Sequence, residues 1–522
     1  MTISIRTNIN SVSTARQLTN AQEKVDMSMV RLSTGLRVNR AADDAAGLAI
    51  SEKLKSQING LNQASRNAKD AISLVQTAEG ALGEIGNMLQ RIRTVALQSV
   101  NDINSVNERA SLQKEVSQLQ TEITRLAQAS EFNGQKLLDG SFQSKRFQVG
   151  ANSGQEIAVS ISGVDASKLG VNRIVSVAGA TSTGIGAAQA AASTAVALGN
   201  GVAGQTLSIT GPVSTGAATT TTINANMTAR QVADQVNLVN GETGVVAKAR
   251  TVVSIQMSAA TDVGNVSFTL GGDIDGGDLG QSMTVGALVE NTNDLTGIVQ
   301  AINDRSSVTG VTAITGATKA EVLLVADDGR DIVIEGFVVS GVATAGLQVQ
   351  GKAGAPNTGP QFGVGFQDAG AVVTLTGATD STRVGGFVQF QSSGGINVTS
   401  TDATNSVLTT TSESSSLVAV NSISVGSADG ASAAIDILDS GIQQINDLRA
   451  TLGAIQNRLQ STVSNLESSS ENLQISNSRI RDADVAIESA ELARAQVLLQ
   501  AGISVLAQAN QQPQQALKLL GG

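Results

Sequence analysis

The chain has 522 residues and a formal net charge of −10, and it contains no Cys, His, Trp or Tyr. Without Cys and His it has no disulfides, no thiolate or imidazole metal ligands, and no thiol or imidazole catalyst. The acidic balance argues against a sequence-independent nucleic-acid binder. The sequence contains no run of about 18 apolar residues, the length that a membrane-spanning helix needs.

The excess charge lies in the middle of the chain. Residues 176–420 contain 8 Lys and Arg against 18 Asp and Glu, whereas the two flanks together contain 26 of each. Balanced flanks can pack without strong self-repulsion, and a charged outer part keeps an assembly soluble. The distribution therefore predicts packed flanks and a solvent-exposed middle.

A joint between two helices is predicted near the N-terminus. A weakly helical segment ends within RLSTGLRVNRAADDAAGLAISEKL (31–54). We expect Gly35 to stop this helix. Asp43 and Asp44 lie near the start of the next helix, where carboxylates favour free N–H groups and the positive end of the dipole. The small residues 45–47 then allow backbones to approach closely.

Three long helices are predicted in the flanks. Apolar residues recur at three- and four-residue steps over 54–96, 112–126 and 438–473, with a turn at 101–104 and a weaker stretch at 468–470. Such heptad-like stripes predict a coiled-coil bundle built from both flanks, in its simplest form within one chain. The first helix would be about 65 Å long at roughly 1.5 Å per residue.

The middle of the chain predicts strands. Residues 142–172 alternate and carry Gly-bearing turns, which is typical of a β-hairpin, and TVVSIQMS and VSFTLGG further on are strand-like. VLLVADDGRDIVIEGF (322–337) predicts two strands joined by a hairpin turn at Asp328-Gly329. The alternative is a disordered middle, against which the frequent apolar β-formers argue.

An internal repeat of 66 residues supports this interpretation. Each copy predicts a short helix, a turn and then strands, so residues 176–420 form one or two α+β inserts. The matching residues are Val232, Val236, Asn237, Thr243, Gly244, Val245 and Ala247 in one copy, and Ile298, Ile302, Asn303, Thr309, Gly310, Val311 and Ala313 in the other.

The two ends, residues 1–34 and 480–519, each predict a single helix rich in small residues. One such helix buries too little to offset an ordering cost of about 1–2 kcal/mol per residue. We therefore expect the ends to fray in a monomer and to order when many copies pack together.

Taken together, the predicted fold class is α+β multidomain: a long α-helical coiled-coil bundle built from both termini, with a β-rich α+β insert in the middle. The predicted segments are an end helix (1–44), the bundle with a β-hairpin (45–175), a β-rich insert of one or two subdomains (176–420), a C-terminal bundle helix (421–478) and a C-terminal end helix (479–522).

Three stretches resemble bacterial flagellin. RLSTGLRVNRAADDAAGLAISEKL is similar to the family's spoke-region signature, and EFNGQKLLDGSFQSKRFQVGAN is similar to its passage from helices into the hairpin. ISNSRIRDADVAIESAELARAQVLLQAGISVLAQANQQPQQALKLL resembles the C-terminal signature. The likeness covers roughly residues 1–175 and 430–522, and in the middle it rests only on the repeat.

The resemblance implies a structural subunit of the flagellar filament, exported unfolded through the type III apparatus and located outside the cell. Its implied partners are further copies of itself, the flagellar cap and hook-associated proteins, an export chaperone on the C-terminal helix and the innate immune receptor TLR5. It implies no cofactor, no metal, no nucleic acid and no membrane insertion.

The resemblance also implies an inter-subunit joint. Internal capping and packing alone is the alternative role for its residues. The expected assembly residues are Arg31, Leu32, Gly35, Arg40, Asp43, Asp44, Gly47, Leu48, Arg481, Asp482 and Asp484.

A second site carried over by resemblance is QRIRTVALQSVN (90–101), similar to the flagellin patch that TLR5 recognises. Arg91, Gln98 and Glu115 match the family positions. Thr94 stands where many recognised flagellins have Glu, and Val95 where they have Leu. Shortening an apolar anchor can weaken an interface hot spot, so we expect reduced recognition. The alternative is a patch that serves filament packing alone.

Other functions remain open on the sequence. A flagellin-like hook–filament junction protein would carry similar terminal helices, and a secreted adhesin would use the insert to bind a ligand. Adjacent carboxylates at 327–328 and at 482 and 484 could in principle do acid–base work, but a turn and a helix signature account for them better. We expect no enzyme.

Overall fold

The computed structural model describes residues 7–101, 103–176, 186–193, 199–214, 216–273, 282–342, 344–354, 366–402, 406–408 and 410–520. They belong to two compact units. The first contains residues 1–76, 144–160 and 452–522, and the second contains residues 77–143 and 161–451. Helices α2 (Ala45–Val100) and α8 (Ala428–Arg481) contribute residues to both.

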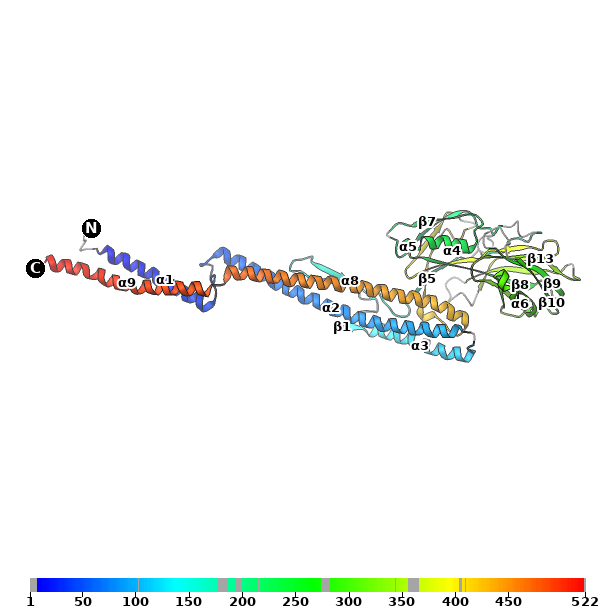
Figure 1. Cartoon of the computed structure of the whole chain (residues 1–522), viewed down its shortest axis with the longest axis horizontal. Coiled ribbons are helices and arrows are strands. Elements are labelled where there is room, and N and C mark those ends of the chain that lie inside the picture. Colours follow the sequence, from blue (N-terminus) through cyan, green and yellow to red (C-terminus); the bar gives the residue numbers. More distant parts are fainter. Residues whose placement is uncertain are drawn as a thin grey trace. The chain divides into compact units, whose positions relative to one another are not determined.

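The first unit contains the end helices α1 (Ile9–Thr34) and α9 (Val485–Leu520), which lie side by side (Figure 1). Asn8 caps α1 through its side-chain oxygen, and its Nδ2 donates to Ala509 O at 2.8 Å. Both predicted end helices are therefore confirmed as helices. That they order only on assembly stays a prediction.

The same unit holds the predicted hairpin, β3 (Lys145–Gln148) with β4 (Glu156–Val159), paired antiparallel. It lies against the helices, because Asn67 Nδ2 of α2 donates to Gln148 O at 3.0 Å. Helix α8 runs without a break through the Ser-rich stretch at 468–470, where Ser470 Oγ donates to Asn62 Oδ1 at 3.0 Å. A helix already held by its flanking turns tolerates three serines.

The second unit contains the remainder of α2 and α8 with α3 (Val106–Ala129), as the three stripes predicted. Ser105 and Glu108 form a capping box at the start of α3, after the predicted turn. The short strands β1 (Glu131–Phe132) and β2 (Gln135–Lys136) follow. Apolar side chains of α2 form the core here, and the fully buried ones include Leu82, Ile85, Leu89 and Ile92.

The described residues between 170 and 419 of this unit form three antiparallel sheets, so the alternative of a disordered middle is wrong for that part of the insert. In the largest sheet β11-β12-β8-β17-β5-β20 follow one another, and β14 joins β8 to β15; the others run β10-β9-β13-β16 and β19-β18-β6-β7. The bounds are β5 (Gly170–Val175), β6 (Gln205–Thr210), β7 (Thr219–Ile223), β8 (Val246–Met257), β9 (Gly264–Asp273), β10 (Ser282–Val289), β11 (Thr312–Thr315), β12 (Val322–Ala326), β13 (Asp331–Val339), β14 (Leu347–Gly354), β15 (Phe366–Leu375), β16 (Thr382–Val384), β17 (Phe387–Ser392), β18 (Asn397–Ser400), β19 (Ser412–Ser414) and β20 (Ser416–Ala419). A 3₁₀ turn at Val420–Ser422 leads to α8.

The insert has two large apolar cores. The first core gathers around α4 (Ala229–Leu238) and includes Leu207, Ile209, Val232, Val236 and Phe390. The second core gathers around α6 (Thr296–Asn303) and includes Phe268, Ile298, Ile302, Ile332 and Phe337. The sequence left open one or two subdomains, and the two cores favour two.

The 66-residue repeat is confirmed as a repeat of structure. A short helix, α5 (Asn240–Thr243) or α7 (Ser306–Thr309), follows α4 or α6, and Gly244 or Gly310 ends it with φ of 69° or 67°. In each copy one asparagine then holds the next strand by two hydrogen bonds. Asn237 binds the backbone N–H and C=O of Ala247 at 2.8 and 3.0 Å, and Asn303 binds those of Ala313 at 2.7 and 2.8 Å.

The predicted hairpin at 322–337 is wrong. Both strands exist, but β12 pairs with β8 and β11, whereas β13 pairs with β9 and β16 in another sheet. The turn at Asp328-Gly329 therefore carries the chain between sheets. A glycine with positive φ, here 74°, suits either connection, so the local sequence does not separate them.

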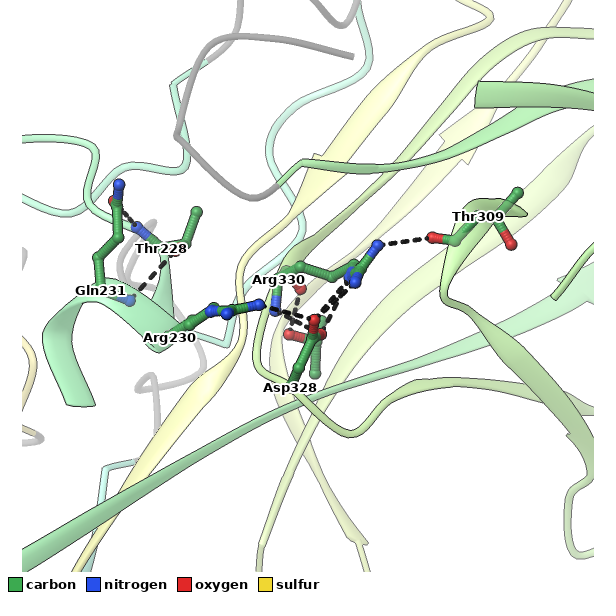
Figure 2. A network of polar contacts seen from close by, with 7 residues as sticks. Thr228, Arg230, Gln231, Thr309, Asp328 and Arg330 are labelled. Carbon is green, nitrogen blue, oxygen red and sulfur yellow. Dashed lines mark hydrogen bonds and ion pairs between the residues drawn. The ribbon is translucent and has the colours of Figure 1, made fainter. Parts of the chain in front are cut away.

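Contacts with both repeat copies hold this crossing turn in place (Figure 2). Gly329 O accepts from Arg230 N, at the start of α4, at 3.1 Å. Arg330 Nη1 donates to Thr309 O, at the end of α7, at 3.1 Å, while Arg330 and Arg230 both pair with Asp328. The turn thus joins a helix end of one copy to a helix end of the other.

Candidate assembly site

The predicted joint lies in the first unit, where the break between α1 and α2 meets the break between α8 and α9. Gly35 ends α1 with φ 71°, and its N–H donates to Arg31 O at 2.8 Å. Gly35 O in turn accepts from Ala483 N at 3.0 Å, and Leu36 forms an isolated bridge with Asp482. The two breaks are therefore held together by backbone hydrogen bonds.

Arginine side chains strengthen this backbone pairing. Arg37 N donates to Arg481 O at 2.7 Å, and the Arg37 guanidinium donates to Ile480 O at 2.7 Å. That oxygen is near the C-terminus of α8, where cations are favourable. Val38, the next residue after Arg37, is buried, with 2% of its surface exposed.

Three aspartates organise the turns of the joint. Asp43 accepts from Asn39 N and Arg40 N at 3.0 and 2.8 Å, and these backbone hydrogen bonds hold the pKa of its carboxyl below its usual range. Asp44 caps α2 by accepting from Gly47 N at 2.8 Å. Asp484 caps α9 by accepting from Ala486 N at 2.8 Å. Asp44 and Asp484 thus cap helices, whereas Asp43 holds the preceding turn at 39–40.

Two ion pairs connect the chain ends. Arg31 in the last turn of α1 meets Glu488 in the first turn of α9 at 2.8 Å, and the Glu488 side chain is only 10% exposed. Arg481 meets Glu52 of α2 at 3.1 Å. The first pair places a cation at a helix C-terminus and an anion at a helix N-terminus, where each is stabilised by the dipole.

The expected assembly residues thus lie together at one joint. Gly47 is buried, and a Cβ there would come within 2.3 Å of the capping Asp44 carboxylate. Leu32 and Leu48 are half-buried. Arg40 and Asp482 are exposed and form no ion pair with the described residues, so their side chains are available to a neighbour.

Sequence reasoning missed Glu488, Glu52 and Arg37. Each contacts a residue more than 400 positions away, so no local spacing marks it. Only a pairing of α1 with α9, and of the start of α2 with the end of α8, would have indicated them. The charge pattern at the facing helix ends was the available signal.

Apolar side chains are exposed along both end helices. This is unusual for a soluble chain, where contiguous exposed apolar surface marks an interaction site. They are Ile9, Val12, Met27 and Met29 on α1, and Val485, Ile487, Val497, Leu498, Ile503 and Val505 on α9, with exposures from 48% to 71%.

The candidate receptor patch lies in the second unit, on α2 and α3. Arg91 pairs with Glu115 at 2.6 Å, and both Arg91 and Gln98 are exposed. Val95 requires a correction: it is 1% exposed and packs in the helical core, so it is not a surface anchor in this structure. Its heptad position, one helical turn from the buried Ile92, explains this.

A chain whose two ends meet at a joint and leave apolar surface uncovered has the organisation of a self-assembling subunit. Comparisons give the family. The pattern of the bacterial flagellin N-terminal helical region matches residues 5–143, and that of the bacterial flagellin C-terminal helical region matches residues 435–520.

Relatives match over the full length. B-type flagellin of Pseudomonas aeruginosa is 38% identical over 530 residues, covering 100% of both chains. Flagellin A of Helicobacter pylori is 30% identical over 540 residues, again covering 100% of both. A solved structure of FliC from Burkholderia pseudomallei is 18% identical, with a TM-score of 0.28, and covers 74% of this chain and 99% of that one.

The chain therefore belongs to the bacterial flagellin family, and it is a subunit of the flagellar filament, a structural polymer. The resemblance seen in the terminal motifs is confirmed. None of the helices built from the described residues has the length and apolar character needed to cross a membrane.

Proposed function

We propose that the exposed apolar residues of α1 and α9 are the contacts through which each filament subunit packs against its neighbours. The observation that supports this is the exposure of Val497, Leu498 and Ile503 on a helix already paired with α1. Their burial in a polymer would be favourable by about 25 cal/mol per Å² of apolar surface. The joint residues would set the direction in which the end helices leave the bundle.

The test introduces one charge into this surface. Val497→Asp should leave a soluble monomer that no longer polymerises, because assembly would bury an unpaired carboxylate. Gln500→Asp is the matched control, since it adds the same charge at a polar exposed position of the same helix. Filament yield by sedimentation and electron microscopy decides, and normal filaments from Val497→Asp would contradict the proposal.

The exposed carboxylate and guanidinium of the joint are a second part of this proposal. Asp482 and Arg40 have no ion-pair partner among the described residues and are offered to neighbouring subunits. Asp482→Asn should weaken polymerisation while monomer helicity by circular dichroism stays unchanged. A critical concentration equal to that of wild type would remove Asp482 from the contact between subunits.

The same exposed apolar residues of α9 support an export chaperone as a partner before assembly. A subunit passing unfolded through the type III apparatus would expose Val497, Leu498 and Ile503 to premature association, which a chaperone on this segment would prevent. Titration calorimetry of the flagellar export chaperone with the full chain should show binding that Val497→Asp weakens. Unchanged binding would place the chaperone elsewhere.

Recognition by TLR5 is proposed for Arg91, Gln98 and Glu115. The support is the exposure of Arg91 and Gln98 beside the Arg91–Glu115 pair. Purified monomer should activate a receptor reporter cell line, and Arg91→Ala should reduce that response. Arg66→Ala, on an exposed part of the same helix, is the control. Equal responses from all three proteins would remove Arg91 from the contact.

A further inference from the structure

Two aspartates and one arginine are buried together in the sheet β10-β9-β13-β16, far along the chain from the joint. Asp273 ends β9, Asp331 begins β13 and Arg383 lies in β16. Their side chains are 0%, 0% and 1% exposed. Asp273 and Asp331 stand directly opposite each other across the two strands. Two ionised carboxylates directly opposite each other repel, so this pair does not stabilise the pairing of β9 with β13.

The charges of this cluster do not balance when all three groups are ionised. Arg383 Nη1 pairs with Asp273 Oδ2 and lies 3.6 Å from Asp331 Oδ2. One guanidinium thus faces two carboxylates. Neither oxygen of Asp331 has a hydrogen bond of good geometry. A buried carboxylate left in this state is costly, and protonation relieves the cost.

The neighbours of Asp331 act in opposite directions on its proton affinity. Burial raises the pKa of Asp331 to about 8, and Asp273 acts in the same sense, whereas Arg383 and Asn200 oppose them. Arg330, the residue before Asp331 and outside β13, is not available to Asp331, since its guanidinium pairs with Asp328 and donates to Thr309 O (Figure 2).

The cluster lies where the two cores of the insert meet. Asp331 directly follows the turn that crosses from β12 to β13, and Gly385-Gly386, which follows Val384 at the end of β16, connects β16 to β17. Asn200 is bound to the part of the insert that contains the first core. Its Nδ2 donates to Met227 O at 2.7 Å, and its Oδ1 accepts from Val202 N at 3.1 Å. Val202 is in the first core, whereas Ile332 and Val384 are in the second.

We propose that Asp331 holds a proton in the folded insert and forms, with Asp273 and Arg383, a pH-sensitive latch between its two cores. With that proton bound, one carboxylic acid, one carboxylate and one guanidinium make a neutral group. When the proton leaves to solvent, a net negative charge remains among buried side chains. Opening the cluster to water then becomes favourable, because hydration stabilises the second carboxylate.

The direction of the pH dependence follows from linkage. An unfolded Asp titrates near pH 3.9, and the folded carboxyl holds its proton to higher pH, so the stabilising effect is complete below about pH 4. It is lost progressively as the pH rises to about 8, the folded value. Because opening releases one proton in this window, the opening constant should rise about tenfold for each pH unit.

Hydrogen exchange of the full chain at pH 6 and pH 8 tests the latch, after correction for intrinsic exchange rates. Peptides that contain β9, β13 and β16 should show an opening constant about 50-fold larger at pH 8 than at pH 6, because the Asp331 carboxyl, with a pKa of about 8, is half deprotonated at the upper pH. Asp331→Asn should abolish that difference, since an amide keeps the shape and cannot ionise. Asp368→Asn on β15 is the control, with a side chain 60% exposed, and should retain it.

Asp273→Asn gives an independent answer, because it leaves one carboxylate paired with one guanidinium. If Asp331→Asn fails to fold, Asp273→Asn decides on the same criterion: loss of the pH difference supports the latch. The proposal is overturned if wild type opens equally at both pH values, or if the folded variants keep the wild-type pH difference.

Discussion

The end helices and the insert differ in where their apolar side chains go. On α1 and α9, residues such as Ile9, Val12 and Val497 are more than 60% exposed. In the insert, residues of the same types fill two cores, where Ile298, Ile332 and Val232 are 0% exposed. The insert therefore buries much of its apolar surface within one chain, although Leu238 and Leu288 are exposed, whereas the end helices leave large apolar side chains exposed along their length.

This difference indicates that the ends and the insert have separate roles in one chain. The ends carry small residues and exposed apolar faces suited to packing with copies of themselves. The insert carries the net charge of −10 and its own hydrogen-bonded devices, such as the two asparagine contacts of the repeat. Changes in the insert should alter its own stability, and changes in the ends should alter assembly.

Removing the insert is the largest test of that separation. Strands β5 and β20 are antiparallel neighbours, and Arg173 stands opposite Ser416. Replacing residues 174–415 by Asn-Gly should close them into a two-residue hairpin. We expect filaments to form, seen by electron microscopy, and the calorimetric transition of the insert to disappear. Soluble variant monomers that never polymerise would show that the insert takes part in assembly.

Gly329→Ala should produce the next largest effect, confined to the insert. Gly329 has φ 74°, and a Cβ there would lie 2.3 Å from the Ala249 Cβ. The positive φ costs about 1–2 kcal/mol for an L side chain, and the clash adds to it, so we expect a loss of about 3 kcal/mol in unfolding free energy. Urea denaturation of the insert transition measures it.

Gly336→Ala is the matched control for that change. Its φ is 69°, and a Cβ there meets no atom within 4 Å. It should therefore show the conformational cost alone, about 1 kcal/mol. Equal losses of unfolding free energy from the two variants would mean that the turn at 328–330 relaxes around the new methyl group. The turn would then not hold the two repeat copies rigidly together.

The repeat offers a paired comparison of smaller size. Asn237→Ala and Asn303→Ala each remove two hydrogen bonds to a buried strand residue, Ala247 or Ala313, which should cost about 2 kcal/mol in unfolding free energy. Hydrogen exchange should show the loss in peptides of the first core for Asn237→Ala and of the second core for Asn303→Ala. Asn265→Ala, at an exposed position of β9, should change neither. Matching losses in both cores from one variant would mean that the insert has a single cooperative core.

The sequence predicted much of this molecule because its signals are local. Heptad stripes located α2, α3 and α8, and Gly35 marked the end of α1. The repeat predicted both helix–turn–strand copies. These features depend on residues within one or two turns of each other, where side-chain spacing and helix capping act.

What the sequence could not predict depends on partners far along the chain. The turn at Asp328-Gly329 has the same local chemistry whether it closes a hairpin or crosses between sheets, and sheet pairing decides. Glu488 acquires its role only beside Arg31. Val95 was assigned to a surface by resemblance, although the same helical stripe that located α2 places it in the core. For that residue, periodicity was the better guide.

Asp484→Ala sharpens the comparison at its smallest scale. Asp484 caps α9 through Ala486 N and Ile487 N at 2.8 and 3.2 Å, and loss of such a cap costs about 1 kcal/mol. Within the insert a loss of that size would be hard to see. On an end helix that buries little, it should shift the helical population about fivefold, since 1.4 kcal/mol corresponds to a factor of ten. Circular dichroism of dilute monomer measures the change in helicity, and the critical concentration measures its effect on assembly.

Asp484→Asn, which can still accept from the same N–H groups, should preserve both the helicity and the critical concentration. Asp482→Ala should leave monomer helicity unchanged. If Asp484→Ala keeps wild-type helicity, the packing of α1 against α9 is enough to hold the end helices. The end helices would then differ from the insert only in their exposed apolar side chains.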